Sequence, residues 1–317
     1  MLHRSTPLDW LVFLALGVAW GSSYLFIKIG VETLSPFTLI AGRTAIGAGV
    51  LALVMVLGRE HLPRSAGTWG HMLIVALLGI AIPFSLITWG EQSIDSALAA
   101  ILNGTVPLLA IVLAAIVLVD EPITLNRLLG LLVGFAGVIA ITSPSFGSGT
   151  GASLPGELAL MGASVSYAAA GVYARRFVRD LRPLPSAFLE VGLAFLVILA
   201  LAFVFEHPLA THVEPSTILA VGWLGLVGSG LAFLAFFFLL GRWGAGRTST
   251  VAYLLPVVGI ALGVAVRHES LSLPVLVGTA LVIGGVAVAN SGFGRRRLMG
   301  RAPRTAAVSE GTVQGGD

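Results

Sequence analysis

The chain has 317 residues, of which 56% are hydrophobic and 10% are charged, and its mean hydropathy is +0.98. Soluble domains carry about 25% charged residues, so this composition excludes a soluble protein and indicates one that crosses a membrane several times. The formal net charge is +3 and cysteine is absent, which excludes disulfides, thiolate metal sites and cysteine nucleophiles.

Ten mainly apolar stretches follow one another along the chain, near residues 10–30, 36–57, 70–90, 95–118, 127–143, 156–177, 184–206, 216–240, 247–266 and 273–292. At a rise of about 1.5 Å per residue, each is long enough to cross a hydrocarbon core of about 30 Å. A continuous apolar run satisfies its backbone in lipid as a helix, because the strands of a membrane barrel alternate between apolar and polar residues. The sequence therefore predicts an all-α integral membrane protein with ten transmembrane helices.

The second half of the sequence repeats the first. An offset of 147 residues aligns Trp20 with Tyr167 and Arg43 with Glu190, and an offset of 148 aligns Glu121, Gly130 and Gly137 with Glu269, Gly278 and Gly285. Each half holds five spans, and an odd number forces the second half to cross the membrane in the opposite orientation. We therefore predict two inverted five-helix repeats, at residues 1–145 and 156–292, and a tail at 293–317 that is basic and then disordered.

Basic residues orient a membrane protein, because short loops rich in Lys and Arg stay in the cytoplasm. With the N-terminus inside, 15 of the 18 Lys and Arg residues fall in inner segments or the tail, and only Arg267 falls in an outer loop. The remaining two, Lys28 and Arg43, lie within spans. We predict that both termini are cytoplasmic. Because the basic residues flank spans rather than form a patch, nucleic acid is not expected as a partner.

Several chemistries lack the residues that they need. The single lysine, Lys28, has none of the glycines of a phosphate-binding loop, so the chain cannot hydrolyse ATP in that way. The six histidines lie at span ends or in loops without metal-ligand spacing, and the only acid that we find deep in a span is Glu190. We therefore predict no catalytic residue, no metal and no cofactor, and a protein that is not an enzyme.

Two ionisable residues lie at membrane depth, where polar groups are costly unless they are paired or hydrated. Arg43 lies seven residues inside the outer end of the second span, and Glu190 lies seven residues inside the inner end of the seventh. Each is about 10 Å deep but from opposite faces, so we expect no direct salt bridge. One interpretation is that each lines one vestibule of a central cavity and senses the charge of the substrate or, for Glu190, a proton. The other is that each fixes the position of its helix, with Arg43 reaching outer polar groups or helix carbonyls and Glu190 bonding to the inner arginines.

Four spans carry interruptions that match in pairs between the halves. Pro83 interrupts the third span where the eighth has Ser229 between two glycines, and Pro107 and Pro256 interrupt the fourth and ninth. A cavity between these spans would be lined by Phe84, Thr88, Asn103, Thr105, Ser229, Thr250 and Tyr253, with aromatic walls from Trp20, Tyr24 and Tyr167. The alternative is that the kinks only shape the bundle.

Glycines on the fifth and tenth spans make small-residue faces suited to close helix contact. They are Gly130, Gly134 and Gly137, with Gly278, Gly284 and Gly285. These faces serve either internal packing of the two repeats or a dimer seam, so a monomer and a homodimer both remain open. Glu121 and Glu269 follow the fourth and ninth spans, and we interpret them as interfacial caps rather than site residues.

Several strings carry a resemblance to a known family. They are "AWGSSYLFIK", "AGRTAIGAGVLAL", "LNGTVPLLAIVLAAIVLVDEPIT" and "GLLVGFAGVIAI". With the ten spans in two units, residues 9 to 292 resemble the drug/metabolite transporter superfamily, EamA type. This resemblance implies a carrier of the bacterial inner membrane that exports amino acids, related metabolites or toxic organic compounds, often with proton coupling. Carriers of phosphorylated substrates in this superfamily use basic residues in the cavity, which the second half here lacks at depth.

We therefore expect a secondary active transporter that exports a small amphipathic metabolite, an amino acid or a drug-like compound by alternating access. Its partners would be the small-molecule substrate, the lipid bilayer and, as a candidate coupling ion, the proton. A passive facilitator or pore and a non-transporting membrane regulator are the alternatives. The substrate, the direction of transport and the coupling ion are not determined by the sequence.

Overall fold

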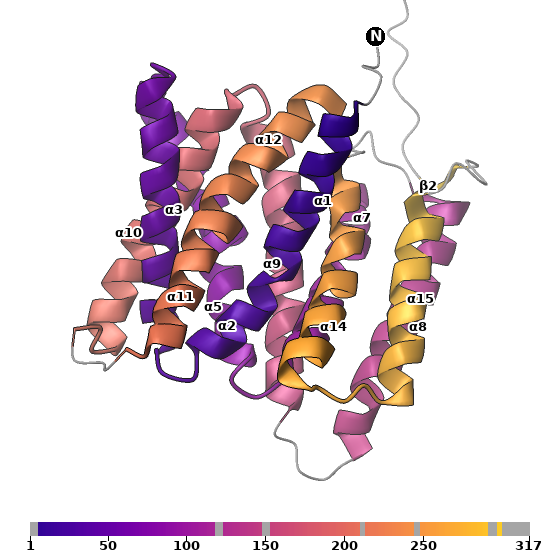
Figure 1. The fold of residues 1–317 in the computed structure, drawn as a ribbon. Coiled ribbons are helices and arrows are strands. Elements are labelled where there is room, and N and C mark those ends of the chain that lie inside the picture. Colours follow the sequence, from indigo (N-terminus) through magenta and orange to yellow (C-terminus); the bar gives the residue numbers. More distant parts are fainter. Residues whose placement is uncertain are drawn as a thin grey trace, which may run out of the picture.

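The chain was analysed as a computed structural model that describes residues 6–117, 123–147, 153–209, 213–243, 248–290 and 297–299. Long helices run side by side between two faces of the molecule (Figure 1). We call the face at which the first helix begins the N-terminal face, and the other the distal face. The predicted tail at 293–317 lies outside the described residues apart from 297–299, and Glu121 lies outside them as well.

The first half contains α1 (Pro7–Gly21), α2 (Ser23–Gly30), α3 (Pro36–Leu57), α4 (Ala66–Ala76), the π-helix η1 (Leu77–Ala81), α5 (Ile82–Gly90), α6 (Ser96–Asn103), α7 (Val106–Val117) and α8 (Leu125–Gly147). The second half contains α9 (Leu154–Phe177), α10 (Pro183–Phe205), α11 (Pro215–Trp223), the π-helix η2 (Leu224–Leu231), α12 (Ala232–Trp243), the 3-10 helix η3 (Ser249–Tyr253), α14 (Leu254–Arg267) and α15 (Leu273–Asn290). A short strand β1 (Ile123–Thr124) pairs antiparallel with β2 (Arg297–Met299).

A helical stretch lies at each of the ten predicted ranges, but only eight of them in the described chain are both long and apolar enough to cross a membrane. The stretch Leu273–Ala289 is apolar but shorter, and α9 is long enough but less apolar. The predicted number of ten spans is therefore supported by length and composition for eight. Because α9 packs against η1, α5, α6 and α7, protein rather than lipid covers much of it, and its serines and tyrosines are tolerated there.

Equivalent helices of the two halves make equivalent contacts. Helix α3 packs on α10, α6 on α14 and α8 on α15. Helix α10 packs against α4 and η1 as α3 packs against α11 and η2, and α9 lies on α5 as α1 lies on α12. The two halves thus interlock across the whole bundle rather than meet at one surface.

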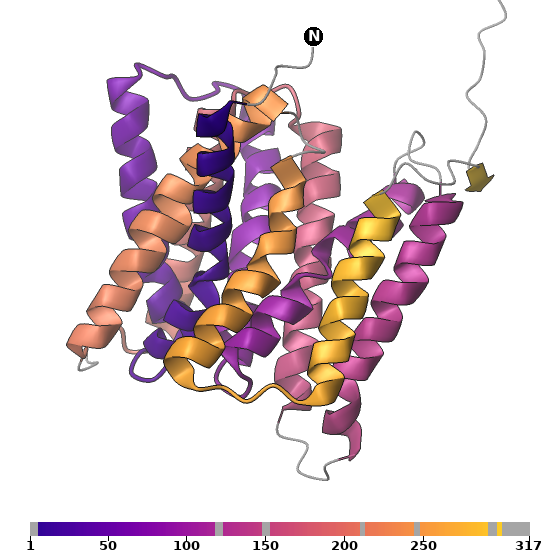
Figure 2. The same ribbon diagram turned by 45° about the vertical axis from the view of Figure 1, so that its right-hand side comes forward.

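Helices α8 and α15 form a pair at one edge of the bundle, which Figure 2 shows most clearly. Their glycines let the two backbones touch. A Cβ added at Gly137 would lie 2.6 Å from the carbonyl oxygen of Gly278, and one added at Gly285 would lie 2.6 Å from that of Gly130. Of the two interpretations of these glycines, the contacts support internal packing of the two halves, except at Gly284, which faces open space.

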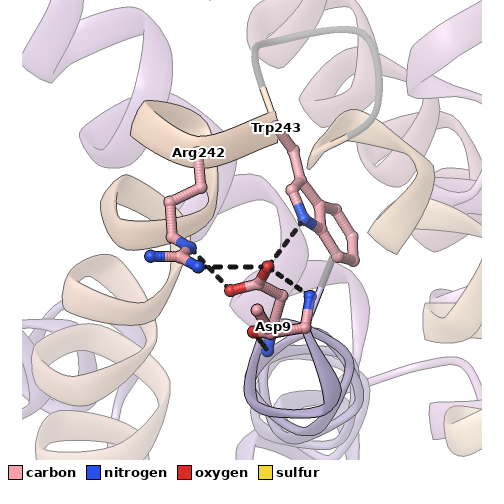
Figure 3. Close-up of polar contacts among 4 residues, drawn as sticks. Asp9, Arg242 and Trp243 are labelled. Atoms are coloured by element: carbon pink, nitrogen blue, oxygen red, sulfur yellow. Dashed lines mark hydrogen bonds and ion pairs between the residues drawn. The ribbon is translucent and has the colours of Figure 1, made fainter. Parts of the chain in front are cut away.

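A buried ion pair joins the first and eighth stretches at the N-terminal face (Figure 3). The carboxylate of Asp9 in α1 is fully buried, and its Oδ1 lies 2.7 Å from Nε of Arg242 at the end of α12. Trp243 donates from its indole nitrogen to Oδ2 of Asp9 over 3.4 Å. Asp9 was not predicted to be a buried acid, so this link between α1 and α12 was missed from the sequence.

At the distal face, carboxylates cap helices of the opposite half. Glu269 accepts from the backbone nitrogens of Ser96 and Ala97, at the start of α6, over 3.0 and 2.9 Å. Glu206 accepts from the backbone nitrogens of Phe37 and Thr38, at the start of α3, over 2.9 and 2.8 Å. Such carboxylates satisfy N–H groups that a helix cannot pair internally. The prediction that Glu269 is a cap is confirmed.

Candidate functional site

The predicted interruptions are real breaks in the helices. In the first half, the π-helix η1 directly precedes Pro83, whose missing N–H prevents a regular α-helical turn there. In the second half, η2 runs for eight residues through the glycines on either side of Ser229. The fourth stretch breaks at Gly104 and Thr105 between α6 and α7, and the ninth begins as the 3-10 helix η3. The weak points thus occur at matching places in both halves.

Arg43 of α3 reaches the π-helix η2. Its side chain is 3% exposed, its guanidinium carbon lies 4.1 Å from the centre of the Phe84 ring, and its Nε donates to Oγ of Ser229 over 3.4 Å. Three predicted site residues, from α3, α5 and η2, are therefore in contact. Tyr24, Tyr167 and Glu91 lie within electrostatic range of the guanidinium. One interpretation of Arg43 was that it reaches outer polar groups or helix carbonyls. Such a contact is not found among the described residues.

A second polar cluster lies at the break between α6 and α7. Asn103 donates from Nδ2 to the hydroxyl of Tyr24 over 2.6 Å, and Ser164 of α9 donates to the carbonyl oxygen of Leu102 over 3.3 Å. The hydroxyl of Thr105 turns back to the same carbonyl at 2.7 Å. All four polar side chains are buried. Ser164 was not predicted as a site residue, because serine at that depth is common in helix packing.

Glu190 of α10 faces the π-helix η1. A Cβ at Gly79 would collide with Oε1 of Glu190, so the glycine makes room for the carboxylate. Among the described residues the carboxylate of Glu190 has no hydrogen bond or ion pair. It does not pair with Arg43, which agrees with the prediction of no direct salt bridge. It does not bond to the described inner arginines either, although one interpretation required such bonds. Tyr167 of α9 lies within electrostatic range of both Arg43 and Glu190.

The remaining predicted residues are not brought to this cluster. The hydroxyl of Tyr253 donates to the carbonyl oxygen of Val286 in α15 over 3.1 Å, which directs the ring toward the α8 and α15 pair. Thr88 is fully buried, and its hydroxyl has no hydrogen-bond partner. Trp20 packs on Phe233 and Phe236 of α12, with ring centres 6.3 and 5.5 Å apart. Thr250 lies in the 3-10 helix η3, at the start of the ninth stretch.

A pocket of about 530 Å³ lies at the N-terminal face between α10 and α12. It is lined by Glu60, Arg182, Pro183, Leu184, Pro185, Leu234, Phe237 and Phe238, none of which was predicted to line a cavity. Arg182 and Glu60 form an exposed ion pair of 2.6 Å at its rim. Leu234 and Phe237 of its lining belong to the same hydrophobic cluster as Phe84, on which Arg43 rests. Arg43 and Phe84 themselves are not among the residues that line the pocket.

Glu91, which follows α5 at the distal face, is a buried carboxylate that the sequence analysis missed. It is fully buried, and neither of its carboxylate oxygens has a hydrogen-bond partner. The ammonium of Lys28 donates instead to the carbonyl oxygens of Glu91 and Ile94, over 2.6 and 2.7 Å. Burial raises the pKa of the Glu91 carboxyl well above its ordinary value of 4.5, and the positive charge of Lys28 opposes this shift.

This raised pKa predicts a pH-dependent contribution to stability. Above pH 4.5 the unfolded state loses the Glu91 proton while the folded state still holds it. The contribution of this carboxyl group to stability is therefore complete below pH 4.5 and declines as the pH rises toward the pKa of the folded state. Glu91→Gln keeps the neutral form at every pH. Thermal unfolding in detergent should show wild type losing stability relative to this variant between pH 5 and 8. A constant difference across that range would contradict the prediction.

Helices that span a bilayer, paired breaks in those helices and a buried polar cluster between them define the class of membrane transporter proteins. The family model of the EamA-like transporter family matches residues 9–143 and, separately, residues 154–291. The chain belongs to this family.

Two of three similar proteins are named as transporters. The "Uncharacterized inner membrane transporter YedA" of Escherichia coli K12 is 30% identical over 261 residues, which are 81% of this chain and 82% of that protein. The "Uncharacterized transporter YoaV" of Bacillus subtilis is 23% identical, over 88% and 95% of the two chains, and "Protein PagO" of Salmonella typhimurium is 25% identical, over 86% and 92%. The family and these relatives point to membrane transporters, not enzymes.

A solved crystal structure supports the fold. It aligns with a TM-score of 0.64 and 23% identity, covering 90% of this chain and 98% of that chain.

Proposed function

We propose that the protein is a secondary active transporter in which two inverted five-helix repeats, at residues 1–145 and 156–292, exchange conformations around a central site. The observation that carries this proposal is the contact of Arg43, Phe84 and Ser229, which joins α3 and α5 of one half to the π-helix η2 of the other. Irregular backbone and polar side chains at membrane depth are the usual elements of transporter sites.

The arrangement of the helices supports the inverted repeat. The family model matches each half separately, and the contacts of α10 with α4 and η1 correspond to those of α3 with α11 and η2. The π-helices η1 and η2 occupy equivalent stretches, and each faces an ionisable residue of α10 or α3. A pair of equivalent, weakened helices allows two equivalent conformations, one open to each face.

We infer that the N-terminal face is cytoplasmic and that the membrane is the bacterial inner membrane. The distribution of Lys and Arg, with 15 of 18 on the inner side, supports this orientation. Access of a reporter in the 144–155 loop from the periplasm tests it. The pocket between α10 and α12 then opens on the cytoplasmic side, where an exported amphipathic compound would enter.

This arrangement best supports the export of a small amphipathic metabolite, an amino acid or a drug-like compound. A passive facilitator would equilibrate its substrate, and a membrane regulator would not move it. Accumulation of substrate in proteoliposomes against its gradient separates the three. If the purified protein does not move any compound that stabilises it, the proposal of a transporter is wrong.

Asn103→Ala should lower transport strongly while the protein remains in the membrane at wild-type abundance. The substitution removes the bond to Tyr24 and an amide at the break between α6 and α7. Asn126→Ala is the matched control, because Asn126 is also 8% exposed but bonds the carbonyl oxygen of Ala289 in α15. Transport rates and abundance are measured for both variants. Equal rates would place the substrate site away from Asn103.

A further inference from the structure

Arg43 brings a positive charge into the interior without a carboxylate partner. Ion pairs between described residues include Arg179 with Asp180, Arg182 with Glu60, Arg242 with Asp9 and Arg267 with Glu32, and none of those found there includes Arg43. A guanidinium carries five N–H donors. In Arg43 only Nε has an acceptor, at the long distance of 3.4 Å, and the terminal nitrogens have none among the described residues.

The neighbours of Arg43 do not neutralise it. The face of Phe84 offers a weak cation–π contact, and Tyr24 and Tyr167 carry neutral hydroxyls. Among the described residues, Glu91 is the one acid within electrostatic range of Arg43, but the charged neighbour that affects Glu91 most is Lys28, ahead of Glu269 and Arg43. An unpaired charge in the interior costs several kcal/mol. A residue that serves only packing would not need that charge.

We propose that the terminal nitrogens of Arg43 bind the carboxylate of the transported molecule, whose apolar body packs on Phe84 and the aromatic side chains beside the α10–α12 pocket. The inference rests on the proposed transport function and names the charge of its substrate. A guanidinium matches a carboxylate with two parallel hydrogen bonds. Gly228 of η2 lies beside the guanidinium, since a Cβ there would be in van der Waals contact with Nη2 at 3.5 Å.

The same arrangement argues against other charge classes. A cationic compound would be repelled by Arg43, strongly so in a medium of low dielectric constant. A phosphate monoester carries nearly two negative charges and would need a second cation, but Lys28 is held by the carbonyl oxygens of Glu91 and Ile94. The apolar walls that Leu234 and Phe237 give to the pocket fit the body of an amphipathic monocarboxylate.

The test is a thermal-shift series on the purified full chain in detergent. The probes are benzoate, 3-phenylpropionate and phenylalanine, each compared with its primary amide, together with 3-phenylpropylamine and phenyl phosphate. At least one carboxylate should stabilise wild type, while its amide and the amine do not. Arg43→Gln should weaken that binding at least about tenfold, because a charge-assisted bidentate contact is lost. Arg267→Gln, which removes an arginine paired with Glu32 at the distal face, should leave it unchanged.

The stability of the unliganded variants separates binding from a structural role. If Arg43 is kept for a substrate, then Arg43→Gln without ligand should be at least as stable as wild type, because a buried unpaired charge has been removed. A variant that unfolds or is clearly less stable would identify Arg43 as a structural anchor and overturn the proposal. No carboxylate shift in wild type, or equal shifts by the amides, would overturn it as well. If a neutral or cationic probe is bound and transported, the transporter function stands and only the anion assignment fails.

Discussion

Gly285→Ala is expected to destabilise the protein by about 1–3 kcal/mol, the range found when a methyl group is forced into a packed interior. Its Cβ would meet backbone atoms on α8, the carbonyl oxygen of Gly130 at 2.6 Å and Cα of Gly134 at 2.8 Å. Backbone atoms cannot rotate away as side chains can. The α8 and α15 pair would have to separate along its length, and thermal unfolding of the purified variant measures the loss.

The adjacent residue provides the control. A Cβ at Gly284 would meet nothing within 4 Å, so Gly284→Ala should leave stability unchanged or raise it slightly through better helix propensity. Both variants add one methyl group to the same helix. Similar losses of stability in both variants would show that substitutions in α15 are harmful for reasons other than its contact with α8. No loss of stability in either variant would show that α8 and α15 do not pack this closely.

The course of the helices was largely predictable from the sequence, because hydrophobic length and helix-breaking residues are local signals. Helix α3 has the predicted bounds, since proline starts it and glycine follows its last residue. Pro83 and the glycines around Ser229 predicted the two interruptions that form η1 and η2. The kind of interruption, a π-helix in both halves, was not predictable, because it depends on how the neighbouring helices fill the widened turn.

The site was predicted in part. The residue types at depth identified Arg43, Asn103 and Tyr24 as polar groups that need partners. Asn103 donates to Tyr24, Arg43 donates to Ser229, and Tyr24 lies within electrostatic range of Arg43. The direction in which a side chain leaves its helix depends on tertiary packing, which is why Tyr253 lies toward α15 instead.

Two buried acids were missed for a different reason. Asp9 and Glu91 lie at the ends of apolar stretches, where an acid is normally exposed to water. Asp9 is covered by the end of α12, and the loop that begins at Glu91 is held by Lys28; both partners are distant in the sequence. An acid at a span end therefore cannot be assigned from the sequence without knowing which helix lies beside it.

Glu190→Gln is expected to abolish the dependence of transport on a pH gradient while exchange of substrate across the membrane continues. Glu190 lies seven residues after the first residue of α10, about 10 Å along the helix, with its carboxylate against the glycine of η1. The cost of a charge there depends on how much water reaches it, and a conformation open to the N-terminal face hydrates it more than a closed one. Proton binding would then favour one conformation over the other.

The variant keeps the shape of the side chain but cannot lose a proton, so the conformational change no longer carries one. Exchange needs no net proton movement and should persist, whereas transport driven by a pH gradient imposed on proteoliposomes should fall to the rate without a gradient. Glu214→Gln is the control, because Glu214 precedes α11 at the distal face and is exposed. Full pH-gradient drive in Glu190→Gln would show that the carboxylate only holds α10 in place. Loss of exchange together with drive would show instead that Glu190 contacts the substrate directly.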